Sequence, residues 1–399
     1  MTIAEKNYDL LQKANEIKDY VSKLRNQIHM NPELGFKEIN TAALIKKELV
    51  SYGVEVLDID VPTGVLGVLK GQKIGGNTVT AIRADIDALP IQEQTGFAFS
   101  SCLDGIMHAC GHDGHTAMLL GVAKLLATMT ADFSGTVKFI FQPGEEVLGG
   151  AEAMVKAGVL ENPKVDNIIA LHSWPYLPTG VIGTWKGAYY AAADAFEAKI
   201  IGGSGHGAYP HKSNDSLLAA THAVTALQAL TSRQLNAIEN TVMSICTFHA
   251  GTAFNIIPEF STFSGTVRTH SEEIRKSIPA KMEKIIKGVA EAFGCQYEFK
   301  YRIGISTVNN NPDVVDDVIA AIHQSLGEQH VTTLPGPVMG SEDFSEYSKL
   351  IKKSAIFRIG TTNPGDPEIP LHSGKYNFNN DTIPYGITAI AQYVLNTNR

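Results

Sequence analysis

The strongest constraint on the fold is the alternation of short apolar runs with amphipathic stretches in the first half of the chain. Strands alternating with helices fold into an α/β layer structure. Polar ligand groups in such sheets are expected at the carboxyl ends of the strands. The predicted strands are residues 54–60, 64–71, 77–87, 135–143 and 165–172, and the predicted helices are 112–129 and 149–157, after an amphipathic N-terminal helix.

A different pattern begins near Gly187. Its order of elements is β-α-β-β-α-β, which is typical of a ferredoxin-like unit. The α/β pattern then resumes with a helix at 312–327, a strand at 354–361 and a final helix from Thr382. We therefore predict an α/β domain with a mixed sheet (1–186 and 306–399), interrupted by an inserted ferredoxin-like domain (187–305). The inserted elements are predicted at residues 193–202, 213–235, 241–251, 261–270, 272–293 and 295–303.

Charge and composition narrow the possible partners. The 399 residues carry a net charge of −8 with no basic cluster longer than a Lys-Lys pair, which argues against nucleic acid. Four cysteines are too few for a disulfide framework in a chain of this length. The N-terminal helix lacks the apolar core of a signal peptide, and no run of about 18 apolar residues predicts a membrane span. We predict a cytoplasmic protein whose partners are small molecules or other copies of itself.

The stretch "MHACGHDGHT" (107–116) gathers several side chains that can bind metals. Cys110 and His112 are two residues apart and cannot share one face of a helix. They can converge if Gly111 permits a tight turn into a helix that starts near His112. The alternative is a buried free cysteine beside surface histidines.

Three further segments offer partners: "FQPGEE" with Glu145 and Glu146, "IALHSWP" with His172, and "PLHSG" with His372. Consecutive residues of an extended chain project to opposite sides, so one glutamate could bind a metal while its neighbour acts as a base. A lone histidine at a strand end is more often simply polar. Taken together, these nitrogen, oxygen and sulfur donors suffice for two divalent ions of Zn, Mn, Co or Ni.

The same segments, in this order, resemble the M20 family of co-catalytic metallopeptidases, in its branch of hippurate hydrolases, N-acyl-amino-acid amidohydrolases and auxin-conjugate hydrolases. The resemblance runs from "LRNQIHMNPELGFKE" (24–38) to the final helix and includes "RADIDALP" (83–90), "GSGHGAYPH" (203–211), "FNIIP" (254–258), "GTVRT" (265–269), "GSEDFS" (340–345) and "PLHSGKYNF" (370–378). It implies that the α/β domain is catalytic and that the inserted domain serves as a dimerisation or lid domain. It also implies two metal ions per subunit, with Cys110 in the bridging position and Glu145 as general base. The implied ligands are Cys110, His112, Glu146, His172 and His372.

The chain departs from most M20 peptidases at two positions. Arg83-Ala84-Asp85 replaces a His-x-Asp segment, and Cys110 replaces a bridging aspartate. The identity of the metal therefore stays open, because a thiolate favours softer ions. Asp85 and Asp113 are expected either to orient ligands from behind or to cap the turns that follow them.

The resemblance also assigns residues to substrate binding. His206 is implied to stabilise the oxyanion, often in a partner subunit, while Asn255 and Arg268 hold the substrate. Arg268 and the Gly340-Ser341 turn would bind a carboxylate. Alternatively, His206 is simply a histidine in a glycine-rich loop, and Arg268 is a surface arginine in an ion pair. An exposed sheet edge in the inserted domain predicts a homodimer or a higher homo-oligomer.

The predicted reaction is hydrolysis of the amide bond of a small N-acyl amino acid by a water that bridges two metals. Three alternatives remain. Cys110 could act as a nucleophile, which would make activity resistant to chelators. The enzyme could be an N-acetyldiaminopimelate-type deacetylase with a narrow substrate. The chain could also be a non-catalytic, metal-stabilised binding protein.

Overall fold

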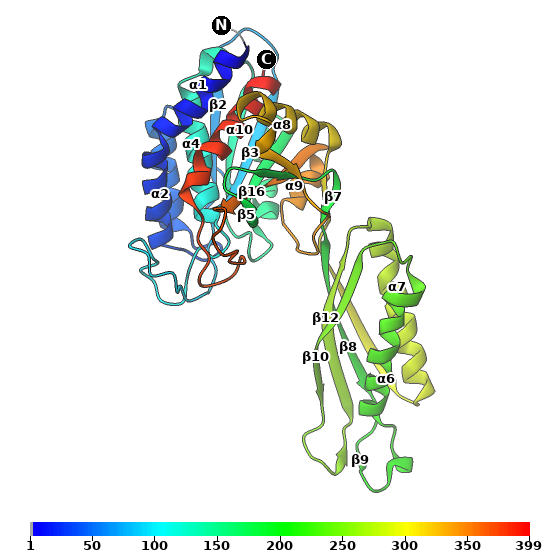
Figure 1. Cartoon of the computed structure of the whole chain (residues 1–399). Helices are drawn as coiled ribbons and strands as arrows, with labels where there is room; N and C mark the ends of the chain where they lie inside the picture. Colours follow the sequence, from blue (N-terminus) through cyan, green and yellow to red (C-terminus); the bar gives the residue numbers. More distant parts are fainter. Residues whose placement is uncertain (1–2) are drawn as a thin grey trace. The chain divides into compact units, whose positions relative to one another are not determined.

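The chain folds into two compact units (Figure 1). The computed structural model describes the backbone of residues 3–399 and the side chains of residues 10–399. The first unit comprises the chain up to Gly187 together with Asn309–Gly336 and Asp343–Arg399, and the second comprises Ala188–Val308 and Pro337–Glu342. Residues 337–342 thus cluster with the second unit, although the sequence pattern assigned them to the first. The first two residues of the predicted catalytic domain lie outside the described range.

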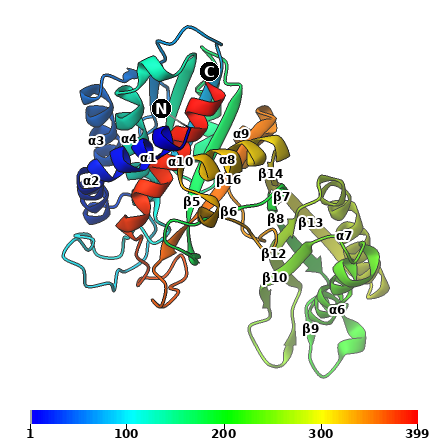
Figure 2. The ribbon, with the colours of Figure 1, turned by 45° about the horizontal axis from the view of Figure 1, so that its top comes forward.

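The first unit is built on an eight-stranded mixed sheet (Figure 2). Its central strands are parallel neighbours, and β1 and β2 run antiparallel at one edge. Every residue of β3 and β4 is buried, as expected for central strands that are covered on both faces. The strand order is β1 (Glu55–Leu57), β2 (Val65–Lys70), β4 (Thr136–Gln142), β3 (Val79–Asp85), β5 (Asn167–Pro178), β16 (Lys353–Thr362), β6 (Ile182–Thr184) and β15 (Val331–Thr333).

Helix α4 (His112–Ala127) lies against β3 and β5 and packs on α2 and α10. A Cβ at Gly121 would come 2.4 Å from Ile387 Cδ1, so this glycine allows α4 and α10 to approach closely. The predicted single N-terminal helix is in fact two helices that meet at Ile17, and α3 and α9 were not predicted. The other helices are α1 (Ile3–Glu16), α2 (Lys18–Met30), α3 (Ile39–Ser51), α5 (Gly150–Lys156), α8 (Pro312–Ser325), α9 (Ser345–Leu350) and α10 (Ile383–Thr397).

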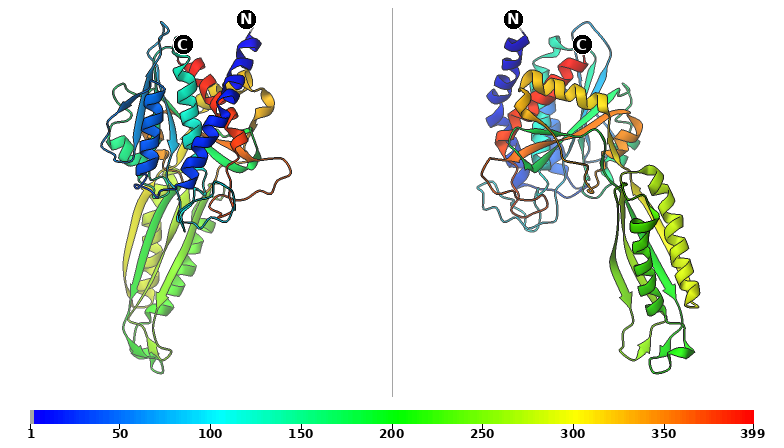
Figure 3. Two further views of the ribbon diagram at one scale, coloured as in Figure 1. Left: turned by 90° about the vertical axis from the view of Figure 1, so that its left-hand side faces the viewer. Right: turned by 45° about the vertical axis from the view of Figure 1, so that its right-hand side comes forward.

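The second unit has the expected βαββαβ succession. Its antiparallel sheet has the order β10-β12-β8-β13, and α6 and α7 lie side by side against it (Figure 3). Residues of β8 alternate between buried and partly exposed, which matches a half-buried strand. The predicted helix 213–235 is shorter, because a π-helical turn replaces its last part from Leu230. The elements are β8 (Ala192–Ile201), β9 (Gly205–His206), α6 (Ser216–Ala229), β10 (Thr241–Ala250), β11 (Ile256–Ile257), β12 (Phe260–Thr269), α7 (Glu272–Ala292) and β13 (Gln296–Ile305); the remaining short strands are β7 (Gly187–Tyr190) and β14 (Val308–Asn310).

None of the helices formed by residues 3–399 has both the length and the apolarity needed to cross a lipid bilayer. The predicted location in the cytoplasm stays a prediction.

Candidate metal centre and active site

The candidate site lies where three strands of the first unit reach the same edge of the sheet. β3 ends at Asp85 and β4 ends at Gln142, and these two residues pair with each other. β5 pairs with β3 only as far as Ala170, so His172 lies just beyond the paired region. Side chains that follow β3, β4 and this part of β5 are therefore brought together, as expected for an α/β sheet.

The turn before α4 brings Cys110 and His112 to this edge. Gly111 has φ 83°, and α4 begins at His112, as the sequence suggested. A Cβ at Gly111 would come 2.8 Å from the Ser173 hydroxyl, so the close approach also requires glycine. Cys110 Sγ lies 3.6 Å from His172 Nε2. The turn thus brings the thiol to the imidazole of the neighbouring strand.

All five side chains predicted as metal ligands lie together. Glu146 Oε1 is 3.8 Å from His112 Nε2 and 3.5 Å from His372 Nε2. The ligand atoms of Cys110, Glu146 and His372 lie within 4.8 Å of one another. Cys110, His112 and His172 are buried, whereas His372 is exposed. The cluster therefore has one side open to solvent.

Two atoms of this cluster are buried without a hydrogen-bond partner: His112 Nε2 and Glu146 Oε1. His112 Nδ1 donates to Asp87 Oδ1 at 3.1 Å, so the other ring nitrogen, Nε2, faces the cluster. Buried polar atoms normally have a partner, because desolvating them without one is costly. A divalent cation is the partner that imidazole, carboxylate and thiolate groups accept in common. The residues therefore fit a divalent metal site.

The electrostatics of the cluster agree with this assignment. Burial raises the pKa of the Cys110 thiol well above its usual range. Burial, with Asp87 and Asp85 nearby, also raises the pKa of Glu146 to about 7. Burial would lower the pKa of His112, but the attraction of Asp85 outweighs it and the pKa is raised. These groups hold protons that a bound cation displaces, since the ligand forms are thiolate, carboxylate and neutral imidazole.

Asp87 is a functional residue that the sequence analysis missed. Its Oδ1 accepts the hydrogen bond from His112, and its Oδ2 accepts the backbone N–H of Glu146 at 3.0 Å. It therefore orients two predicted ligands at once. The available signal was its place in "RADIDALP", two residues after Asp85 at the end of a buried strand.

Asp85 lies beside the predicted ligands. It accepts hydrogen bonds from His115 Nδ1 at 2.5 Å and Arg83 Nη1 at 2.7 Å, and it is 3.7 Å from His112 Nε2. The other nitrogen of His115 accepts the backbone N–H of Ser173 at 2.7 Å. Since both of its nitrogens are engaged, His115 holds Asp85 in place and is not a further ligand in this arrangement.

Asp113 has a different place from the one expected. It bonds to Arg25 Nε at 2.6 Å and His29 Nδ1 at 2.8 Å, both on α2. It therefore fastens the first turn of α4 to α2 and orients none of the predicted ligands. The sequence could not show this, because the partners lie more than 80 residues away.

The expected geometry of Glu145 and Glu146 is wrong. β4 ends at Gln142, and the two glutamates lie in a turn in which the Leu148 N–H donates to the Glu145 carbonyl. Their carboxylates lie on the same side, within 4.8 Å of each other and of His112. A turn, unlike a strand, does not alternate its side chains. The Glu145 carboxylate therefore lies directly beside the predicted ligand Glu146.

In the second unit, the candidate substrate residues form two separate groups. His206 in β9 pairs with Ile256, and the Gly207 N–H donates to the Asn255 carbonyl. Arg268 Nη1 donates to the Ser341 hydroxyl at 2.8 Å, and the Gly340 carbonyl accepts the Ala191 N–H.

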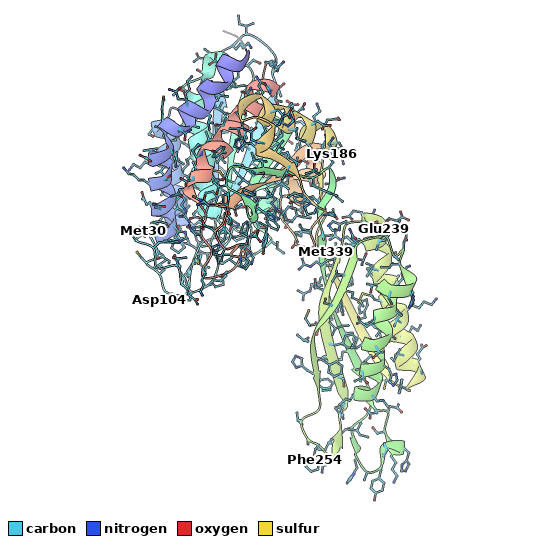
Figure 4. All side chains as sticks on the ribbon, viewed as in Figure 1. Met30, Asp104, Lys186, Glu239, Phe254 and Met339 are labelled. Atoms are coloured by element: carbon cyan, nitrogen blue, oxygen red, sulfur yellow. The ribbon has the colours of Figure 1, made fainter. Side chains whose placement is uncertain are left out.

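These two groups lie at opposite ends of the sheet of the second unit. Arg268 pairs with Ala193 near the start of β8, and His206 follows Ile201 at its end. At ~3.3 Å per strand residue, they are separated by roughly 25 Å. Figure 4 labels Met339 near one end of this unit and Phe254 at the other. One copy of the unit therefore cannot bring both groups to the same small substrate.

A cluster of nitrogen, oxygen and sulfur donors at a strand edge, with a further carboxylate beside it, is the arrangement of a metal-dependent hydrolase. Residues 81–396 match the model of peptidase family M20/M25/M40. The chain belongs to this family, and the M20 resemblance found in its motifs is confirmed.

Individual relatives agree with the family match. The chain is 42% identical to the N-acetylcysteine deacetylase of Bacillus subtilis (strain 168), over 82% of this chain and 85% of the relative. It is 45% identical to the N-acyl-L-amino acid amidohydrolase of Geobacillus stearothermophilus, over 74% of this chain and 79% of the relative. Among solved structures, the Bacillus subtilis YXEP protein, described as a dinuclear metal-binding peptidase of the M20 family, superposes with a TM-score of 0.84 and 34% identity, covering 96% of this chain and 98% of that protein.

Proposed function

We propose that the protein is a metal-dependent amidohydrolase that releases an amino acid from a small N-acyl amino acid. The observation that carries this proposal is the pair of unpartnered buried atoms, His112 Nε2 and Glu146 Oε1, beside the carboxylate of Glu145. The relatives that act on N-acyl amino acids support the same reaction class.

Glu145 acts as the general base and then as the general acid. Its carboxylate takes a proton from the attacking water and delivers it to the departing amine. The neighbouring Glu146 and His112 are held by Asp87, so the position of Glu145 relative to the ligands is fixed by the same turn. Divalent ions bound here would supply Lewis acidity toward water and the carbonyl oxygen.

We propose two ions per subunit. Cys110 Sγ supports this number, because it is near His172 on one side and belongs to the same group as Glu146 and His372 on the other. From this middle position, the Cys110 thiolate would help to hold both ions. The mixed donor set favours Zn, Mn, Co or Ni over Mg or Ca, which prefer oxygen ligands alone.

The carboxylate of the amino acid is assigned to Arg268, whose guanidinium already donates to Ser341 next to Gly340. The planar guanidinium suits a carboxylate better than a lysine would. His206 and Asn255 are assigned to the oxyanion and the acyl carbonyl. Because these two groups lie at opposite ends of the unit, we propose that one group serves a neighbouring copy, which requires a homodimer or larger homo-oligomer.

The test is the release of free amino acid from N-acetyl, N-benzoyl and long-chain N-acyl amino acids by metal-stripped protein, with each of the four ions restored separately. Activity that disappears on stripping and returns with an ion supports the proposal. Activity that survives chelators but not thiol alkylation would favour Cys110 as a nucleophile. Binding of an ion without turnover of any substrate would favour a narrow biosynthetic deacetylase or a non-catalytic binding protein.

The role of a second copy can be tested separately. The Glu145→Gln and His206→Ala variants are each expected to be nearly inactive. Mixing them after subunit exchange should restore activity, because some hybrid sites then have both an intact Glu145 and an intact His206. A mixture no more active than its components would show that both residues act within one chain.

A further inference from the structure

Three large apolar side chains are exposed around the turn that carries the catalytic glutamates. Phe36 is 44% exposed, Val147 59% and Leu148 40%. Val147 and Leu148 directly follow Glu146, and the Leu148 N–H closes the turn onto the Glu145 carbonyl at 2.8 Å. These carbon surfaces therefore lie beside the reacting centre.

The three side chains surround the same turn and are here called the apolar rim (Phe36, Val147 and Leu148). The ring of Phe36 lies across the two glycines at the base of the turn: a Cβ would come 2.8 Å from Phe36 Cε2 at Gly144 and 3.5 Å from it at Gly149. A Cβ at Gly35 would come 3.1 Å from Val147 Cγ2 and 3.4 Å from Asp87 Oδ2. Gly35, which precedes Phe36, thus lies between Val147 of the rim and Asp87, the residue that orients His112 and Glu146.

The backbone of the rim is strained. Phe36 has φ 62° and Leu148 has φ 56°, values that bulky L-residues rarely adopt. Four non-glycine residues among those described have a positive φ. Besides Phe36 and Leu148 they include His372, whose Nε2 lies 3.5 Å from Glu146 Oε1. Backbone strain of this kind gathers at functional sites, where the rest of the structure holds it in place.

Neither exposure nor strain helps this chain to fold. Glycine or asparagine would be easier at positions 36 and 148, and a polar residue would be easier at position 147. Exposed apolar patches in folded proteins mark places where another apolar group binds. The turn's own charges, Glu145 and Glu146, face His112, so the rim presents carbon atoms only.

We propose that the apolar rim binds the acyl group of the substrate and makes the enzyme prefer bulky apolar acyl groups, such as benzoyl, over acetyl. This inference rests on the proposed amidohydrolase function. The amino-acid side of the substrate carries a carboxylate, which is assigned to Arg268. The acyl side carries no charge, and it is bonded directly to the carbonyl carbon that reacts beside Glu145.

The experiment compares kcat/KM for N-benzoyl-L-alanine and N-acetyl-L-alanine in the metal-loaded full-length enzyme. Wild type should favour the benzoyl substrate. In Phe36→Asn, Leu148→Asn and Val147→Ser, the benzoyl-to-acetyl ratio should fall by about tenfold, the scale on which hydrophobic pockets discriminate. Asparagine tolerates a positive φ, so both asparagine variants should melt at or above the wild-type temperature. Val50→Ser is the matched control, because Val50 is 65% exposed in α3 and outside the rim.

Four results would overturn the inference: a wild type that favours acetyl, an unchanged ratio in all three rim variants, an equal loss on both substrates, or the same fall in Val50→Ser. An equal loss would mean that the rim only supports the turn. If one variant melts at a lower temperature than wild type, the benzoyl-to-acetyl ratios of the other two test the inference. Wild type that hydrolyses neither these nor any other N-acyl amino acid with any ion refutes the proposed function itself, whereas active enzyme with an unchanged ratio refutes only the rim.

Discussion

Each unit contains a buried polar cluster, and the two clusters differ in how they are completed. In the second unit, Asp194 accepts hydrogen bonds from Arg275 at 2.6 Å, Tyr301 at 2.9 Å and the Gly304 N–H at 2.9 Å. In the first unit, Glu146 Oε1 and His112 Nε2 are also inaccessible to water, yet neither atom has a hydrogen-bond partner.

The difference separates a structural cluster from a binding site. The Asp194 carboxylate is neutralised and saturated by donors of its own chain, so it has no capacity left for a ligand. The cluster at Cys110 has acids and imidazoles with unused lone pairs and too few donors nearby. Buried polarity alone is therefore not a sign of function, whereas buried polarity left incomplete is.

The largest expected effect is on turnover. Glu145→Gln keeps the shape of the side chain but removes the base, so kcat should fall by at least ~100-fold. The bound metal, measured by elemental analysis, should stay near the wild-type amount. A variant that keeps more than about a tenth of the wild-type turnover would contradict the assigned role.

The second effect concerns stability in the other cluster. Asp194→Leu removes the buried partner of Arg275 and leaves it paired with the half-exposed Glu272, so it should lower the free energy of unfolding by about 3–5 kcal/mol. The double variant Asp194→Leu/Arg275→Met should recover part of this loss, because the unpaired charge is gone. Urea unfolding measures both. Metal affinity should stay unchanged. A marked loss of metal affinity in folded Asp194→Leu protein would contradict a purely structural role of the Asp194 cluster.

The third effect concerns the residue that orients the ligands. Asp87→Asn should weaken metal binding by about 10–100-fold, the usual cost of losing a partner behind a ligand. Asp166→Asn is the matched control, because Asp166 accepts the Val79 N–H at 2.8 Å on the same sheet but touches no ligand. Competitive chelator titration compares the two variants, and equal affinities would contradict the role of Asp87.

The smallest effect is a pH dependence of stability that arises where His29 of α2 contacts Asp113 and Glu93. Burial would raise the pKa of Glu93, but hydrogen bonds from His29, Thr95 and Ser101 lower it from 4.5 to about 2. Ionised Glu93 therefore contributes stability above pH ~4.5 that is lost as the pH falls toward 2. Burial would lower the pKa of His29, but Asp113 and Glu93 raise it above 6.5, so its contribution is present below pH ~6.5 and is lost as the pH rises through the raised value.

The Glu93→Gln variant isolates this contribution. The difference in unfolding free energy between wild type and variant should be largest near pH 5.5 and should shrink toward both pH 2.5 and pH 8.5. Urea titrations at these three values measure it. A difference that does not change with pH would show that Glu93 acts only through packing.

The sequence predicted the parts of the site that depend on local patterns. Cys110, His112, Glu146, His172 and His372 could be proposed as ligands that lie together, because each follows a strand or lies at the start of a helix, and an α/β sheet brings such positions together. The role of Asp87 could not be found, because it depends on distances to residues 112 and 146 that no local pattern encodes.

Other failures have local causes. The break between α1 and α2 at Ile17 has neither proline nor glycine to mark it. We predicted extended chain at Glu145 and Glu146, although Pro143 and Gly144, which favour a turn, separate them from the apolar run. Residue types at the site were thus predictable, but the side each one faces was not.

The insertion also affects how the protein is synthesised. β5 ends at Pro178, but its neighbour β16 starts at Lys353, so the ribosome must add roughly 175 residues before the central sheet can close. At typical rates of translation this takes on the order of 10–35 s, during which β5 has an open, apolar edge. The second unit is nearly continuous in sequence and can fold during that interval. A nascent chain stalled between these two strands should therefore be the species most in need of a chaperone.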